Sequence, residues 1–217
     1  MKRREFGQFC GLARALELVG ERWTLLLVRE LLARPCRYTD LQQNLPGIPT
    51  NVLSTRLKEL EAEGIVERQV APAPQRGVVY RITPDGERLE PAVIALARWG
   101  NGHLGERDHE IVPASTIALA FRATFNAKAA GDVAATWEIR AADVVLYVRV
   151  EDGTVTTGVG AAPTEPDLVM TFAAGAEDVP TFRDILAALK AGEADLTGRK
   201  SLAAVFLKTF TPAATTA

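Results

Sequence analysis

Short polar and cationic side chains gather in the first half of one segment, GIPTNVLSTRLKELEAEGIVERQ, which spans residues 47–69. They are Asn51, Ser54, Thr55, Arg56 and Lys58. Short amide and hydroxyl side chains can hydrogen-bond to the edges of bases when a helix approaches closely. Guanidinium and ammonium groups pair with phosphate oxygens. The chemistry that this set offers is recognition of nucleic acid, provided that one element presents the residues together.

A leucine stripe puts these residues on a single helix. Leu53, Leu57 and Leu60 fall on one side when successive residues are stepped by about 100°. Because that stripe must face a core, Asn51, Thr55 and Lys58 lie on the opposite face, with Ser54 on its edge and Arg56 on the flank. Thr50 precedes the stripe and is expected to cap the helix.

The neighbouring segments predict the other elements of a compact domain. Helices are expected at residues 12–20, 21–35, 39–46 and 84–100, and strands at residues 65–70 and 78–82. Thr39 and Thr83 are the expected caps of the third and the last of these helices. The loop APAPQRG between the strands is rich in proline, so it should project and carry Arg76 at its tip.

This order is that of a winged helix-turn-helix, in which a three-helix core carries a β-hairpin wing. A helix fits the major groove of duplex DNA, so the helix after Thr50 is the expected reader of bases. The candidate DNA contacts are Thr39, Thr50, Asn51, Ser54, Thr55, Arg56, Lys58 and Arg76. The alternative is a solvated helix and an exposed hairpin in some other helical domain.

A family resemblance covers nearly all of residues 10–100. The runs CGLARALELVGERWTLLLVRELLARPCRYTDLQQNLPGIPTNVLSTRLKELEAEGIVERQV and VVYRITPDGERLEPAVIALARWG, with the spacing between them, resemble the HxlR family of bacterial transcriptional regulators. The resemblance implies a homodimer whose two-fold interface is built by the N-terminal segment and the helix around Leu89–Trp99. It also implies that the helix after Thr50 recognises a pseudo-palindromic double-stranded DNA operator, with repression as the expected outcome.

Cys10 and Cys36 are the two cysteines, too few for a disulfide framework. Members of the HxlR family often have Cys-Pro at the position of Cys10, and some use that cysteine as a thiol switch for electrophiles or oxidants. Here Gly11 follows instead, while Arg14 one helical turn on could supply the positive charge that activates a thiol. Cys10 is therefore the redox candidate, against a purely structural role, and Cys36 is expected to be a partly buried bystander.

The second half predicts a separate α+β module after a break in the pattern. Helices are expected at residues 115–131, 179–192 and 199–210, and strands at residues 134–140, 143–150, 154–159 and 167–174. Such strands would form a mainly antiparallel sheet packed against the helices. The expected domains are residues 1–106 and residues 115–211, joined by a linker at 107–114.

The run DLVMTFAAGAEDVPTFRDILAALKAGEADLTGRKSLAAVFLKTF resembles the C-terminal part of a sterol-carrier-type lipid-binding domain. In that family a final helix closes an apolar cavity that holds fatty acyl chains, sterols or other apolar molecules. The resemblance implies an apolar small-molecule effector, and the candidate lining residues are Trp137, Leu146, Met170, Phe172, Phe182, Leu186, Phe206 and Phe210. The alternative is that all of these side chains form the core, which a module of this size needs.

Catalysis and metal binding find no support in the pattern of residues. His103 and His109 lie in the charged segment between the halves, and no convergent set of metal ligands or catalytic groups is apparent. We expect no enzyme activity, no cofactor and no metal. The net charge of −2 gives no overall attraction to nucleic acid or to membranes, and no apolar run approaches the roughly 18 residues of a membrane span. A cytoplasmic protein without a membrane partner is expected.

These features combine into one hypothesis, a dimeric regulator whose operator affinity changes when an apolar effector binds the C-terminal module. One alternative makes Cys10 the sensor and leaves the C-terminal domain with a structural role. A more distant alternative is a lipid carrier whose first half only dimerises.

Overall fold

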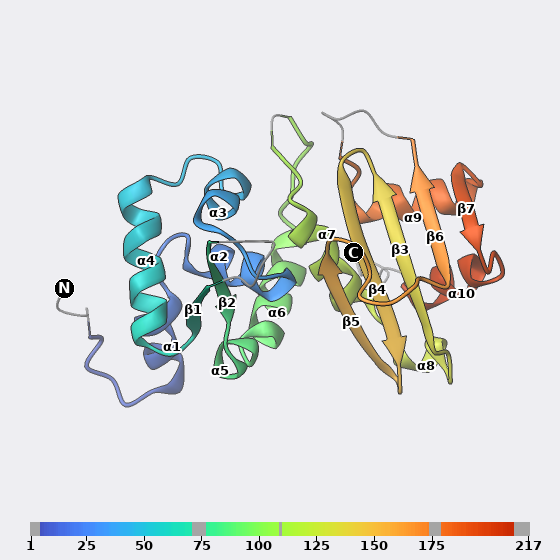
Figure 1. Ribbon diagram of the computed structural model, residues 1–217. Coiled ribbons are helices and arrows are strands. Elements are labelled where there is room, and N and C mark those ends of the chain that lie inside the picture. Colours follow the sequence, from blue (N-terminus) through green and yellow to red (C-terminus); the bar gives the residue numbers. More distant parts are fainter. Residues whose placement is uncertain (1–4, 71–76, 109, 174–178, 211–217) are drawn as a thin grey trace. The chain divides into compact units, whose positions relative to one another are not determined.

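The computed structural model describes residues 5–70, 77–108, 110–173 and 179–210 (Figure 1). The chain folds into two compact units, Met1–Leu96 and Ala97–Ala217, and each contains its own buried apolar residues. Helices and strands occur in both units, which confirms the predicted α+β class. Within the described ranges, no helix is long and apolar enough to cross a membrane.

The first unit has the order of elements that the sequence predicts for a winged helix (Figure 1). These elements are α1 (Gly11–Val19), α2 (Thr24–Ala33), α3 (Tyr38–Asn44), α4 (Thr50–Ala62), β1 (Val66–Val70), β2 (Val78–Ile82), α5 (Pro84–Glu87) and α6 (Glu90–Asn101), whose last five residues belong to the second unit. Apolar side chains from α2, α3 and α4 converge in its core. The fully buried leucines among them are Leu27, Leu31, Leu41, Leu53, Leu57 and Leu60.

A short bridge ties the connection between α2 and α3 to the β1–β2 hairpin. The hairpin is antiparallel and pairs Val66 with Ile82. The backbone N–H of Cys36 donates to the carbonyl of Tyr80 (2.9 Å), and the carbonyl of Cys36 accepts from the N–H of Tyr80 (2.8 Å). Both backbone groups of Cys36 are thus held by β2, which fixes where the following helix α3 begins.

The helix predicted at residues 84–100 is in fact two helices, α5 and α6. Thr83 caps the first as expected, because its hydroxyl accepts a hydrogen bond from the N–H of Gly86 (3.1 Å). One continuous helix would place Pro91 in its interior, where proline lacks the donor and clashes with the carbonyl four residues earlier. Pro91 is instead the second residue of α6, where its missing N–H has no intrahelical partner to lose.

Among the described residues, the second unit forms a five-stranded sheet with helices packed on one face (Figure 1). Its elements are α7 (Ala114–Thr124), α8 (Ala127–Ala130), β3 (Ala135–Ala141), β4 (Val144–Glu151), β5 (Thr154–Val159), β6 (Leu168–Phe172), α9 (Phe182–Ala191), β7 (Ala194–Gly198) and α10 (Leu202–Thr209). The strand order is β5-β4-β3-β6-β7, and each neighbouring pair is antiparallel except β3 with β6.

The helix predicted at residues 115–131 is interrupted between α7 and α8. Phe125 has an extended backbone with ψ 128°, which ends α7. Asn126 then caps α8, because its side-chain carbonyl accepts from the N–H of Ala129 (3.0 Å). The N–H of Asn126 donates to the carbonyl of Thr209 at the end of α10 (3.0 Å). This contact is remote in sequence, so helical periodicity alone does not reveal the break.

Strand β7 is absent from the predicted elements, since its sequence ADLTG contains few of the β-branched and aromatic residues that favour strands. It forms because Ala194–Gly198 pairs along its whole length with β6. Gly198 has φ 106°, and a Cβ at that position would lie 2.4 Å from the carbonyl oxygen of Asp167. Close approach of two strands thus requires glycine at the end of this edge strand.

Candidate nucleic-acid interface

Helix α4 is anchored by the predicted leucine stripe. Leu53, Leu57 and Leu60 are all buried, which confirms that this side of the helix faces the core. The helix begins at Thr50, directly after the extended residue Pro49. Thr50 was expected to be the cap, but it is the first helical residue, so that prediction is wrong by one position. No side chain among the described residues caps the N-terminus of α4, and its first turn contains no acid.

The opposite side of α4 exposes several of the predicted contact residues. Thr50, Asn51 and Lys58 are exposed, and Ser54 and Thr55 are half-buried. The hydroxyl of Thr55 donates to the carbonyl of Asn51 one turn earlier (2.8 Å). That bond uses the donor of Thr55 and leaves its oxygen able to accept. The bond uses only the backbone of Asn51, so the exposed side-chain amide of Asn51 stays available to a ligand.

Tyr38 is a member of the interface that sequence reasoning missed. Its phenol donates to the backbone carbonyl of Thr50 (2.8 Å) and lies 3.2 Å from the hydroxyl of Ser54. Since the phenol proton is used on Thr50, the hydroxyl of Ser54 serves as donor in the second bond. Tyr38 begins α3, so this contact fixes the start of α4 against α3. Nothing in the local pattern around Tyr38 could have identified a partner 16 residues away.

Thr39 occupies the first turn of α3 and is exposed. The residue before the helix is Arg37, so the prediction that Thr39 is the cap is wrong by two positions. Asp40 holds this helix end, because its carboxylate accepts from the N–H of Arg37 (3.0 Å). Thr39 thus remains a solvent-facing residue in the first turn of α3, and the carboxylate of Asp40 caps the helix.

Arg56 does not share the exposed face with Lys58. Its side chain is only 15% exposed, and its guanidinium is paired with the carboxylates of Glu59 and Glu21, the latter at 3.5 Å. The expected contact of Arg56 with a phosphate stays a prediction, but this geometry does not present the group to a ligand. Arg76, the predicted wing contact, lies outside the described residues.

A buried carboxylate fixes the angle between α2 and α3. Glu30 is 1% exposed, and one of its oxygens accepts from Nε and Nη2 of Arg29 (3.0 and 2.6 Å). The other oxygen accepts from Nδ2 of Asn44 at the end of α3 (2.9 Å). An ionised group in the interior needs such partners, because burial removes its hydration. The sequence showed Glu30 only as one acid within an apolar helix.

The two cysteines have opposite environments. Cys10 is exposed and stands immediately before α1, whereas Cys36 is buried in the bridge to β2. Burial raises the pKa of the Cys36 thiol from 9.0 to about 12, although nearby Arg34 opposes that rise. The Cys36 thiol also lies 3.4 Å from the carbonyl of Arg34, which it can reach as a weak donor. Cys36 is therefore neutral at physiological pH, and Cys10 is the accessible thiol.

The eight residues predicted to line an apolar cavity are all buried in one continuous core of the second unit. Phe206 illustrates the packing, with its ring centroid 4.7 Å from that of Phe210, 5.3 Å from Phe121 and 5.4 Å from Trp137. These side chains thus contact one another, as the alternative of a plain core requires. Their role in ligand binding stays a prediction.

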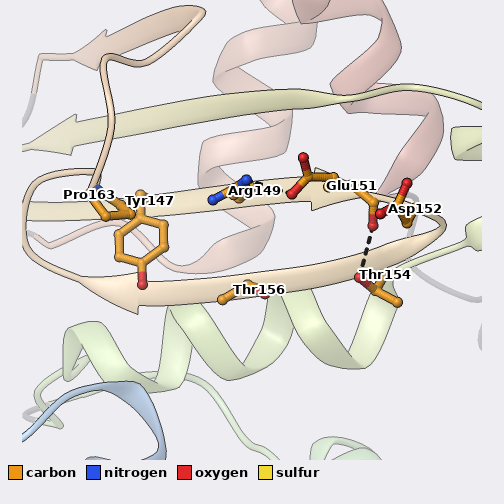
Figure 2. Close-up of a pocket in the computed structure, with 7 residues that line it drawn as sticks. All are labelled: Tyr147, Arg149, Glu151, Asp152, Thr154, Thr156 and Pro163. Carbon is orange, nitrogen blue, oxygen red and sulfur yellow. Dashed lines mark hydrogen bonds and ion pairs between the residues drawn. The ribbon is translucent and has the colours of Figure 1, made fainter.

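A hollow of about 210 Å³ lies elsewhere in this unit, along the β4–β5 hairpin (Figure 2). The residues that line it are mostly polar: Tyr147, Arg149, Glu151, Asp152, Thr154, Thr156 and Pro163. None of the eight residues predicted to line an apolar cavity is among them. Arg149 and Glu151, which both line it, form an ion pair with each other. In the described part of the chain, no cluster of three or more His, Cys, Asp or Glu side chains could hold a metal ion.

We predict that alkylation separates the two thiols. N-ethylmaleimide at about pH 8 should label Cys10 rapidly in the folded protein and Cys36 only after unfolding, because the thiolate is the reactive form. Peptide mapping by mass spectrometry measures both rates.

The raised pKa also means that the stability contributed by the neutral Cys36 thiol is complete below about pH 9 and is lost as pH rises toward 12. Cys36→Ala is the control, and equal labelling of both cysteines would contradict the burial of Cys36.

Comparison with known proteins places the first unit. The family model of the HxlR-like helix-turn-helix matches residues 18–108. An HTH-type transcriptional regulator of Synechocystis, sll1512, is 33% identical over 106 residues, which cover 49% of this chain and 78% of that protein. The HTH-type transcriptional regulator YodB of Bacillus subtilis is 36% identical over 87 residues, covering 40% of this chain and 78% of YodB.

Solved structures align with the same half of the chain. The oxidised form of the redox regulator HypR is 31% identical, with a TM-score of 0.41, and covers 46% of this chain and 99% of its own. Quinone-bound YodB is 32% identical, with a TM-score of 0.37, and covers 42% of this chain and 96% of its own. The family match ends at residue 108, so the sterol-carrier resemblance of the second half stays a prediction. Through its first half, the chain belongs to the HxlR-like helix-turn-helix family of transcriptional regulators.

Proposed function

We propose that this protein binds an operator in duplex DNA by placing the first two turns of α4 in the major groove. The observation that carries the proposal is the exposed polar side of α4, opposite a leucine stripe that is fully buried. A helix held in this way can lie in the groove without exposing its apolar side. The proposal assigns no catalytic step, cofactor or metal to the chain.

Each exposed group of α4 has a distinct role in this proposal. Asn51 reads a base edge, since a side-chain amide can make two hydrogen bonds to adenine. Lys58 pairs with a phosphate, and so do the uncapped N–H groups at the start of α4, where no acid repels an anion. Ser54 contacts bases only as an acceptor, because its proton is directed to Tyr38. Thr39 contacts the backbone from the start of α3.

We predict that Lys58→Met and Asn51→Ala have different effects on DNA binding. Lys58→Met should weaken all duplexes alike and make the plot of log K against log salt less steep by about 0.9, the value for one lost phosphate contact. Asn51→Ala should leave that slope unchanged and cost about 1–3 kcal/mol against the preferred sequence, which relaxes specificity. Fluorescence anisotropy over a series of salt concentrations measures both. An unchanged slope in Lys58→Met would remove Lys58 from the interface.

We also propose that the protein acts as a homodimer on a pseudo-palindromic operator. Large apolar side chains are exposed on α1 and α6, and the most exposed on each are Leu12 (69%) and Trp99 (70%). Leu96 and Ala92 precede Trp99 at helical spacing and are also exposed, so α6 presents an apolar stripe. Soluble monomers rarely expose such stripes, and a second copy that covers both helices would bury them.

We predict that Leu96→Glu converts the dimer into monomers, because it would bury a charge in the interface. Sedimentation velocity measures the change, and operator affinity should fall with it, since each monomer contacts one half-site. Val70→Glu is the matched control, as Val70 is also an exposed apolar residue but lies at the end of β1. A dimer that survives Leu96→Glu would exclude α6 as the interface.

A second candidate concerns the input that the regulator senses. The exposed thiol of Cys10 supports addition to electrophiles, and it immediately precedes α1, which is half of the proposed dimer interface. An apolar effector in the second unit is the other input, and its proposed site is the aromatic cluster around Phe206. Such a ligand must separate rings that now contact one another, so its binding has to compensate for those lost contacts.

Two probes discriminate between these inputs. If Cys10 is the sensor, p-benzoquinone should change the operator affinity of the wild type and leave Cys10→Ser unaffected. If the second unit is the sensor, oleate should change the affinity of both proteins equally and alter the fluorescence of Trp137. A protein whose DNA affinity responds to neither probe would contradict regulation by either route.

A further inference from the structure

The guanidinium of Arg56 joins two separate segments of the first unit. Glu59 lies one turn further along α4, and its carboxylate pairs with Nη1 of Arg56. Glu21 lies in the turn between α1 and α2, and its carboxylate is 3.5 Å from Nη2 of Arg56. The two acids are about half exposed, whereas the arginine between them is 15% exposed. Arg56 is thus enclosed by its partners rather than presented by α4.

The turn that contains Glu21 includes a non-glycine residue with a positive φ. Trp23 adopts φ 79°, a left-handed conformation that costs free energy for a residue with a side chain. Gly20 lies three residues earlier, and a Cβ at Gly20 would lie 2.4 Å from the carbonyl oxygen of Leu16. The N–H of Thr24 donates to the carbonyl of Glu21 (3.1 Å), which closes the turn before α2. The position of Glu21 therefore follows from the geometry of the whole turn between α1 and α2.

Charge alone would give Arg56 a different role. A cation in the second turn of a DNA-reading helix is expected to contact phosphate, as Lys58 does in the proposed function. For Arg56 to do so, its guanidinium would have to leave two carboxylates and a largely buried site. Within the described residues, Glu21 forms an ion pair with Arg56 alone. Glu21 would therefore lose its partner if Arg56 moved to a phosphate.

We propose that Arg56 is a positioning residue, which sets the angle of α4 relative to the turn between α1 and α2 and makes no contact with DNA. This inference rests on the proposed function of α4. Because α1 carries part of the exposed apolar surface, a shift of α1 moves the turn, and the Glu21–Arg56 pair passes that shift to α4. The pair is thus a route by which a change at the dimer interface alters operator affinity.

Two classes of variants test this role, with a duplex selected from a random-sequence pool by the wild-type protein as the probe. Arg56→Met keeps the length of the side chain, and Lys58→Met is its matched control. We expect Arg56→Met to weaken binding about threefold to tenfold, the range of a modest coupling energy, with an unchanged salt slope. Lys58→Met should instead reduce the slope by about 0.9.

Glu21→Gln gives the sharpest contrast, because two explanations predict opposite signs. If Arg56 acts only through charge near DNA, removing a nearby acid should strengthen binding. If Arg56 positions α4 through Glu21, Glu21→Gln should weaken binding, and the double variant Glu21→Gln/Arg56→Met should be no weaker than Arg56→Met alone. Stronger binding by Glu21→Gln, or a reduced salt slope in Arg56→Met, would overturn the proposal.

Hydrogen exchange measured without DNA separates failure of this inference from failure of the proposed function. Arg56→Met and Glu21→Gln should each accelerate exchange both in residues 20–24 and in the N-terminal half of α4, whereas Lys58→Met should affect neither. Unchanged exchange in both segments would overturn the inference even if DNA binds. Absence of DNA binding by the wild type would overturn the proposed function, while the exchange result still decides whether the link exists.

Discussion

The buried carboxylate of Glu30 is the interaction on which the first unit depends most. It accepts hydrogen bonds from Arg29 on its own helix and from Asn44 at the end of α3, so a change in the angle between α2 and α3 would remove the hydrogen bond that Asn44 donates to a buried carboxylate. Losing a hydrogen bond to a buried charged group costs on the order of 1.5–3 kcal/mol. Helix α3 is therefore held at a defined orientation relative to α2 before any ligand is present.

Two further contacts pass that orientation to α4. Tyr38 hydrogen-bonds to the carbonyl of Thr50, and the leucine stripe through Leu57 packs against the core. One contact fixes the start of α4 and the other fixes its rotation about the axis, so the polar side must face solvent. A rigid surface of this kind loses little conformational freedom on binding, which favours affinity. The fold thus positions the interface through groups that never reach the ligand.

Much of the first unit could be predicted because its signals are local. The spacing of Leu53, Leu57 and Leu60 lies within one helix, and Thr83 announces a helix start by its type and place. In the second unit, the break at Phe125 and the strand Ala194–Gly198 escaped prediction. Both arise from contacts between segments far apart in the sequence, with α10 in the first case and with β6 in the second. Local preference for helix or strand carries no information about such partners.

The sequence by itself determined which side of α4 is buried, since apolar periodicity dictates that side whatever the partner is. It also carried the resemblance to the HxlR family, in the runs at residues 10–70 and 78–100. On a helical wheel Lys58 lies opposite the leucine stripe and Arg56 lies on its flank, but only the tertiary structure decided which of the two cations has a carboxylate partner outside α4. Lys58 faces solvent, whereas Arg56 meets a carboxylate from the turn between α1 and α2. The physical reason is that pairing of a charge depends on distance in space, and a partner 35 residues earlier in the chain becomes a neighbour only when the domain has folded.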